Sequence, residues 1–396
     1  MATSLECGAD PERYRASNWQ CERTSGGEFK AMTGVLRGIS GCCGLRLLCL
    51  LLWGLLAQSV PAAFGASEPE LPRAGAVFQA RDTLDTTADA KEDAEQCLQG
   101  LRWKPGDFEV RIETPRENEG DLLVRFPSPV ASGNAVNDLV SMEWYAARDK
   151  DRRPCAADCV IVVHESGRGM TVGRIFARGL NAQGLHTFLI HLPGYGARRT
   201  PDSDRAEKML DGLKQAVADV RRARDAAASL PLITGEVFGV QGTSLGGFVT
   251  STAAGLDTGF DRVFILLAGG NLHDVVLKGQ KDAAQVRKRL EALGVKPDQI
   301  RELARPVEPL RVAHRLRPTG TWLYSGRYDD VVPPACSLAL AQAASLPAGH
   351  HIEMAADHYS GILYLPAVIA EIRAKMNAAP PAESEVGEGE SSSDRN

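Results

Sequence analysis

Short apolar runs alternate with amphipathic segments over most of the chain from about residue 107 to residue 376. Uninterrupted apolar runs of this length are typical of strands that are buried on both faces of a sheet. They occupy residues 159–164, 187–191, 236–241, 262–267, 321–324 and 351–354. Helix-compatible segments at residues 171–183, 205–228 and 247–255 separate several of them. This alternation predicts βαβ units, and therefore an α/β fold with a mainly parallel sheet.

Three earlier segments have a different pattern, in which apolar and polar positions alternate. They are residues 108–113, 121–126 and 139–146. A period of two is typical of half-buried antiparallel strands. We expect these three segments to form one edge of the sheet.

One pentapeptide lies where a predicted strand gives way to a predicted helix. Residues 242–246 read Gly-Thr-Ser-Leu-Gly, with the strand at 236–241 before them and the helix at 247–255 after them. A strand that turns sharply into a helix exposes one serine hydroxyl, here that of Ser244, and the flanking glycines allow the close approach. The next backbone N–H, that of Leu245, then points to where an oxyanion would form. The alternative is a glycine-rich turn with an ordinary serine, and the context on both sides favours the nucleophile.

An acid and a base follow Ser244 in the order that this turn predicts. Asp329 lies in a loop after the strand at 321–324, and His358 lies in a loop after the strand at 351–354. A histidine can take the proton of a serine hydroxyl, and a carboxylate behind it fixes the tautomer. We therefore predict a catalytic triad of Ser244, Asp329 and His358. The alternative acids are Asp330, Asp357 and Asp274.

Residues 107–376 resemble an α/β-hydrolase, nearer to the dienelactone-hydrolase and acetylxylan-esterase-like branch than to the lipases. The matching residues are Gly242, Ser244, Gly246, Asp329 and His358. The resemblance implies a mostly parallel eight-stranded sheet with helices on both faces and a small helical cap. It also implies a serine hydrolase that cleaves carboxylic esters through an acyl-enzyme, with no cofactor and no metal.

The chain departs from this family at the second oxyanion donor. Many members carry His-Gly-x-Gly after the third strand, whereas residues 164–167 here read His-Glu-Ser-Gly. By position, Ser166 supplies the N–H, with Glu165 as the alternative. The carboxylate of Glu165 is either a solvated loop acid or part of the pocket mouth, where it would repel anionic substrates.

The connection from residue 268 to residue 320 is long for a link between two core strands. Residues 281–293 and 297–303 predict helices, so this segment is expected to form the cap over the site. Candidate pocket residues, each equally compatible with ordinary packing, are Leu272, His273, Val276, Leu277, Tyr195 and Tyr359.

The first 66 residues have the organisation of an export leader. An apolar run at residues 45–56 follows Arg37 and is itself followed by small residues, the order of a secretory signal. Residues 1–31 are acidic, so Met32 is a candidate for the true start. The mature protein is then periplasmic or secreted, and the alternative is an uncleaved N-terminal membrane anchor.

The remaining segments complete the division of the chain. We expect residues 67–105 to be a loosely ordered lead-in, 106–376 to be the hydrolase domain and 377–396 to be a disordered acidic tail. The net charge is −5 and no basic stripe with interleaved aromatic residues occurs, so nucleic acid is not an expected partner. Acids interrupt the basic turn at residues 221–224, which indicates a solvated helix face.

Four cysteines remain after the leader: Cys97, Cys155, Cys159 and Cys336. Cys155 and Cys159 could form a local disulfide, or all four could be free thiols. Their spacing, without a partner set, is a weak zinc signal.

The sequence thus favours an exported serine hydrolase with a small-molecule ester as its substrate. An acyltransferase or a peptidase could use the same triad. A protein of another class, a non-catalytic secreted binding protein on a hydrolase scaffold, would have no need of an intact Ser, Asp and His.

Overall fold

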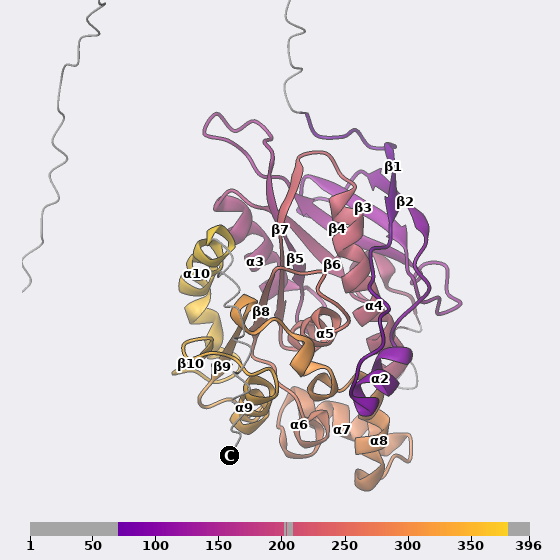
Figure 1. Cartoon of the computed structure of the whole chain (residues 1–396), viewed down its shortest axis with the longest axis vertical. Coiled ribbons are helices and arrows are strands. Elements are labelled where there is room, and N and C mark those ends of the chain that lie inside the picture. The colour runs from indigo at the N-terminus through magenta and orange to yellow at the C-terminus, as the bar shows by residue number, and fades with distance from the viewer. Residues whose placement is uncertain (1–69, 202, 204–208, 379–396) are drawn as a thin grey trace, which may run out of the picture. The chain divides into compact units, whose positions relative to one another are not determined.

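The computed structural model describes residues 70–201, 203 and 209–378 (Figure 1). The predicted leader, with its signal, its alternative anchor and Met32, lies outside the described residues. The predicted tail also lies outside them, apart from residues 377 and 378. Within the described ranges, no helix combines the length and the apolar character that a bilayer span requires.

A ten-stranded sheet forms the centre of the described chain (Figure 1). The strand order is β1-β2-β3-β4-β6-β5-β7-β8-β9-β10. The strands are β1 (Val77–Arg81), β2 (Asp107–Glu113), β3 (Leu122–Pro127), β4 (Leu139–Tyr145), β5 (Ala157–Val163), β6 (His186–His191), β7 (Ile233–Thr243), β8 (Arg262–Leu266), β9 (Thr321–Gly326) and β10 (His351–Met354).

The sheet has an antiparallel edge and a parallel body. Strands β1 to β4 pair antiparallel with one another, and β4 pairs antiparallel with β6. From β6 through β5, β7, β8 and β9 to β10, every pairing is parallel. The expected number of eight strands is wrong. The antiparallel edge is wider than expected because the segment before residue 106 adds β1 to it.

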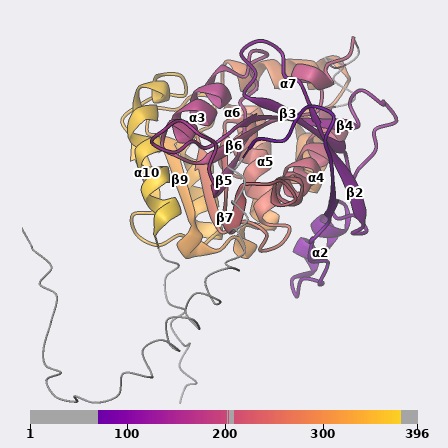
Figure 2. The same cartoon turned by 90° about the horizontal axis from the view of Figure 1, so that it is seen from above.

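Helices cover both faces of the sheet. Figure 2 shows α3 and α10 on one side of the strands and α4 and α5 on the other. The helices are α2 (Glu92–Gln99), α3 (Thr171–Ala182), α4 (Met209–Ala228), α5 (Leu245–Ala254), α6 (Leu272–Lys278), α7 (Asp282–Ala292), α8 (Ile300–Ala304), α9 (Pro334–Ala343) and α10 (Leu365–Asn377). Short 3-10 turns link them: η1 (Gly196–Arg198), η3 (Pro297–Gln299), η4 (Arg305–Val307), η5 (Pro309–Arg311), η6 (Ala313–Arg315), η7 (Pro318–Gly320) and η8 (Ser360–Tyr364).

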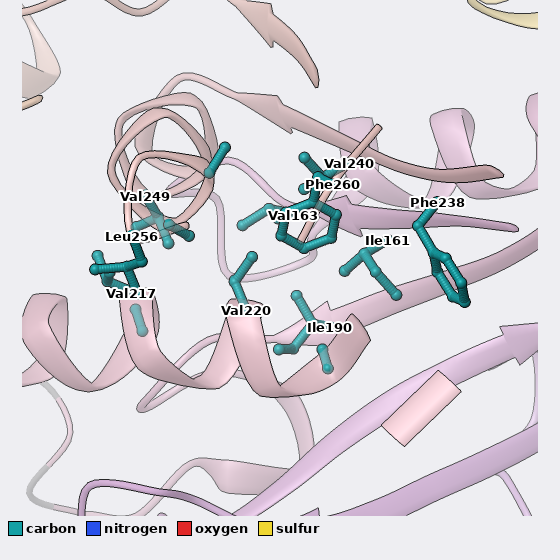
Figure 3. Packing of buried hydrophobic residues seen from close by; sticks show 14 of the residues in the cluster. Ile161, Val163, Ile190, Val217, Val220, Phe238, Val240, Val249, Leu256 and Phe260 are labelled. Carbon is teal, nitrogen blue, oxygen red and sulfur yellow. The ribbon is translucent and has the colours of Figure 1, made fainter. Parts of the chain in front are cut away.

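The larger core lies between the sheet and the α4–α5 layer. Val217 and Val220 of α4 and Val249 of α5 belong to the same buried cluster as Ile161 of β5 and Ile190 of β6 (Figure 3). The opposite faces of β5 and β6 pack in a second cluster under α3 and α10. The central strands are mainly apolar because both of their faces are covered.

The lead-in is not loosely ordered, contrary to the expectation for residues 67–105. It contains β1 and α2, and Leu98 of α2 is fully buried. Between them, Asp82 accepts hydrogen bonds from the guanidinium of Arg222, and the Thr83 hydroxyl donates to Asp225. These long-range pairs with α4 hold a segment whose composition alone gave no sign of order.

The basic turn of α4 is not a solvated face, as the sequence had indicated. Arg221 is almost completely buried and donates to Asp257 at 2.8 Å and to Asp225 at 3.0 Å. The lead-in and the loop after α5 cover this side of α4. Buried arginines need such partners, because an unpaired buried charge is costly.

The four described cysteines are free thiols, so the disulfide considered between Cys155 and Cys159 is not formed. Cys97, Cys159 and Cys336 are buried. Burial raises the pKa of the Cys336 thiol to about 11, which keeps it protonated and unreactive at neutral pH.

Candidate active site

The turn from β7 into α5 places Ser244 in an unusual backbone conformation. Its φ is 53° and its ψ is −115°, a region that residues with a side chain rarely adopt. The N–H of Ser244 donates to the carbonyl oxygen of Leu266 on β8 at 2.9 Å. A Cβ on Gly242 would collide with the Gly246 carbonyl, and one on Gly246 would collide with that of Val163. The two glycines are therefore required by the close approach of strand and helix.

The side chains of Ser244, His358 and Asp329 form one hydrogen-bonded chain. Ser244 Oγ lies 2.9 Å from His358 Nε2, and His358 Nδ1 lies 2.7 Å from Asp329 Oδ2. Asp329 and His358 are both buried. The other carboxylate oxygen of Asp329 accepts the backbone N–H groups of Val331 and Val332, at 2.9 and 2.8 Å. Both of its oxygens are thus engaged, which fixes the carboxylate toward the imidazole.

The three alternative acids have other partners. Asp330 forms an ion pair with Lys281 at 3.1 Å, and Asp274 accepts from Lys278 at 2.7 Å. The carboxylate of Asp357 accepts the backbone N–H groups of the two residues that follow His358. Within the described ranges, Asp329 is the carboxylate hydrogen-bonded to the His358 ring.

A second histidine, His164, orients the loop after β5. Its Nδ1 lies 2.6 Å from the carbonyl oxygen of Glu165, and its Nε2 accepts the N–H of Leu192 at 3.1 Å. Burial lowers the pKa of His164 to about 3, so the ring is neutral and Nδ1 carries the proton. In a trans peptide the carbonyl and the following N–H point in opposite directions. The N–H of Ser166 therefore points away from His164.

The same loop is held from a second side. The hydroxyl of Tyr195 donates to the carbonyl oxygen of Ser166 at 3.1 Å. Ser166 borders one cavity together with Ser244 and Leu245. Leu245 opens α5, and the first N–H groups of a helix have no acceptor within it. Ser166 and Leu245 thus lie at the edge of the space above the Ser244 hydroxyl.

Glu165 does not line the pocket mouth. Its carboxylate accepts the backbone N–H groups of Val172 and Gly173, at 3.1 and 3.0 Å, in the first turn of α3. A helix N-terminus offers unpaired N–H groups and a partial positive charge, and both attract a carboxylate. The side chain of Glu165, at the position where the resemblance implies glycine, is therefore directed toward the start of α3.

A buried carboxylate that the sequence analysis missed supports the turn that carries Tyr195. Glu143 on β4 accepts from His191, Arg174 and Tyr145. Burial alone would raise the pKa of Glu143, but these hydrogen bonds outweigh it and lower the pKa to about 2. The other ring nitrogen of His191 accepts the N–H of Ala197, two residues after Tyr195. In the sequence, Glu143 was only a polar position of the alternating segment at residues 139–146, so no signal pointed to this role.

A cavity of about 350 Å³ opens beside Ser244. Helices α4 and α5 form part of its wall, and α6, α7 and α8 from the 268–320 segment form another part. Besides Ser244, the remaining lining residues are Ser166, Tyr195, Val307, Val331 and Val332. These three helices lie together in Figure 1, next to α2. Of the candidate pocket residues, Leu272, Val276 and Tyr195 line the cavity, whereas His273, Leu277 and Tyr359 do not. In the part of the chain that the structure describes, no three His, Cys, Asp or Glu side chains are grouped to hold a metal ion.

Comparison with known proteins identifies the architecture. No protein-family model matches the sequence, and no curated protein matches it. Among solved structures, an acetyl xylan esterase from Paenibacillus sp. R4 superposes with a TM-score of 0.52. The match covers 73% of this chain and 96% of that one, at 16% sequence identity. The chain has the α/β-hydrolase fold.

Other α/β-hydrolases superpose less closely. Acetyl xylan esterase 1 from Thermoanaerobacterium sp. JW/SL YS485 has a TM-score of 0.48 at 13% identity, with 75% of this chain and 96% of that one covered. A puromycin-hydrolyzing peptidase from Mycobacterium tuberculosis has a TM-score of 0.49 at 16% identity, with 69% of this chain and 46% of that one covered.

Proposed function

We propose that this α/β-hydrolase cleaves carboxylic esters through an acyl-enzyme formed on Ser244. The observation that carries the proposal is the hydrogen-bonded chain from Ser244 through His358 to Asp329, beside an open cavity. Nucleophile, base and orienting acid in this geometry are what acyl transfer requires. The acetyl xylan esterase from Paenibacillus sp. R4, which has the same fold, is consistent with the proposal.

The proposed reaction uses the three side chains in turn. Ser244 Oγ attacks the ester carbonyl carbon, and His358 Nε2 accepts the hydroxyl proton as the new C–O bond forms. Asp329 stabilises the imidazolium and keeps its Nδ1 proton directed away from the substrate. When the tetrahedral intermediate collapses, His358 donates the proton to the leaving alkoxide. Water then attacks the acyl-enzyme by the same route in reverse, which releases the acid and restores Ser244.

We assign the oxyanion hole to the backbone N–H groups of Leu245 and Ser166. Leu245 follows the nucleophile, so its N–H lies where charge develops on the carbonyl oxygen. The contact from His164 to the Glu165 carbonyl supports Ser166 as the second donor, because it turns that N–H away from the His164 side. Tyr195 fixes the other side of the same residue.

The proposal includes export. The apolar run at residues 45–56 and the small residues after it support a cleaved signal, with a periplasmic or secreted product. N-terminal sequencing of the mature protein tests this, since a start between residues 62 and 67 is expected. A product that still begins at Met1 or Met32 would favour an anchor.

Hydrolysis of p-nitrophenyl esters by two serine variants tests the proposal. Ser244→Ala should abolish turnover, because it removes the nucleophile. Ser251→Ala on the same helix is the matched control, since the Ser251 hydroxyl is buried and donates to the Gly247 carbonyl. Equal activity of the Ser244 variant and the parent would exclude the mechanism. Loss of turnover in both variants would indicate that the substitutions disturb the structure of α5.

A further inference from the structure

We infer that the acyl group this site accepts is an unbranched apolar chain of medium length, about the size of octanoyl to decanoyl, rather than acetyl. The inference rests on the proposed function and adds to it the class of substrate. Its basis is the shape and chemistry of the cavity beside Ser244.

The lining of the cavity includes one face of each of two helices, α4 and α5, and the space beside these two faces is called the channel here. On α5 and its N-cap it is lined by Ser244, Leu245, Phe248, Val249 and Thr252. These positions repeat at three- and four-residue intervals, so they form one continuous face of the helix. The wall from α4 has the same character, with Met209, Leu210, Leu213 and Val217. The two helices therefore flank the channel along its length.

The helix geometry gives the length of the channel. Thr252 lies eight residues after Ser244, so the lined face of α5 extends about 12 Å from the nucleophile at 1.5 Å per residue. Met209 and Val217 are also eight residues apart, which gives the same length on α4. An extended chain advances about 3.5 Å over three main-chain bonds, or roughly 1.2 Å per bond, so about ten bonds span this distance. An acetyl group would fill only the part nearest to Ser244.

The walls that α4 and α5 contribute to the channel are apolar beyond the nucleophile, apart from Thr252. The Thr252 hydroxyl is directed to the carbonyl oxygens of Phe248 and Val307, at 3.1 and 3.5 Å, rather than to a ligand. Among the described residues that line the channel, the charged ones are Asp282 and Arg289, both on α7. Arg289 is exposed, as is Gln285, a polar residue of α7 that also lines the cavity. Along the α4 and α5 walls a polar acyl group would lose water without gaining partners, whereas methylene groups gain by burial.

The segment after α8 borders the channel at Thr252, the lining residue of α5 that lies farthest along the helix from Ser244. Val307 lies there, because its carbonyl oxygen is next to the Thr252 hydroxyl. Ala304 also lines the channel and comes one helical turn before Val307. A large side chain at position 304 should therefore shorten the channel and leave the space near Ser244 unchanged.

The experiment measures kcat/KM for p-nitrophenyl acetate, butanoate, octanoate, decanoate and palmitate. For the parent enzyme, kcat/KM should rise roughly two- to fourfold with each methylene that becomes buried, up to octanoate or decanoate. It should fall again for palmitate. Ala304→Phe should move the optimum to butanoate. Val307→Ala, which enlarges the far end, should move the optimum toward longer chains.

Ala292→Phe is the control for the added aromatic ring. Ala292 is exposed on α7 and does not line the channel, so this variant should keep the parent optimum. Labelling by a fluorophosphonate shows in each variant that the nucleophile is intact. The inference is wrong, and the proposed function stands, if the labelled parent prefers acetate. The same holds if both channel variants have the same optimal chain length as the parent. If the parent neither labels nor turns over any ester, the proposed function itself fails.

Discussion

Nδ1 of His164 donates to the carbonyl oxygen of Glu165 across 2.6 Å, and this contact orients the peptide group whose N–H belongs to Ser166. Removing the ring frees that peptide group to rotate. His164→Ala should therefore lower kcat by about 10²-fold with little change in KM, because a donor displaced by about 1 Å loses most of its value in the transition state. Steady-state kinetics on p-nitrophenyl octanoate measure kcat and KM separately.

A second buried histidine provides the control for that variant. His186 is at the start of β6, at the opposite end of the sheet from the site, and accepts hydrogen bonds from Trp144 and Ala147. His186→Ala should destabilise the fold but leave kcat of the folded fraction unchanged. Equal loss of kcat in the two variants would mean that His164 acts only through stability.

His164 should also make stability depend on pH. The pKa of its ring falls from 6.5 to about 3 on folding because of burial, so between these values the unfolded chain binds the extra proton. The free energy of unfolding therefore falls as the pH falls through this range, by at most about 1.4 kcal/mol per pH unit from this group. Chemical denaturation at several pH values should give a shallower dependence for His164→Asn. An unchanged slope would show that other groups account for the acid sensitivity.

Two adjacent aspartates give a matched pair for the acid. Asp329→Asn should lower kcat by about 10⁴-fold and leave the fold intact, because the amide favours the wrong imidazole tautomer. Asp330→Asn should cost little, since Asp330 is paired with Lys281 and does not contact His358. Circular dichroism and ester turnover of both variants check this. A larger loss of kcat in the Asp330 variant would reassign the acid.

Glu165 should contribute to stability and not to substrate charge preference. Its carboxylate accepts two N–H groups at the start of α3, so Glu165→Ala should lower the free energy of unfolding by about 1 kcal/mol. The ratio of kcat/KM for a neutral ester to that for a matched anionic ester should stay the same. An anionic ester that becomes a much better substrate would show that this carboxylate faces the pocket after all.

The positions of Ser244, Asp329 and His358 could be predicted because each depends on local pattern. Every one follows an apolar run that forms a strand of the parallel part of the sheet, and parallel strands bring their carboxyl ends to the same edge. Glycines beside Ser244 marked the turn, and the Gly-x-x-Asp-x-x-Val-Pro pattern of residues 326–333, directly after a strand, favoured Asp329.

Contacts that depend on three dimensions could not be predicted in the same way. The lead-in has no apolar run long enough to stand out, and its order comes from partners such as Arg222 that are distant in sequence. The role of Glu165 depends on where α3 begins relative to the β5 loop. The role of the His164 ring depends on its contacts with the backbone groups of Glu165 and Leu192. The pattern of side chains along the sequence does not show such contacts.

Labelling of the full chain with a fluorophosphonate, followed by mass spectrometric mapping of the modified residue, tests the central claim most directly. An activated serine should react stoichiometrically, the adduct should map to Ser244, and Ser244→Ala should abolish it while Ser251→Ala does not. A folded protein that resists the reagent, or an adduct on another residue, would contradict the assignment of Ser244 as the nucleophile.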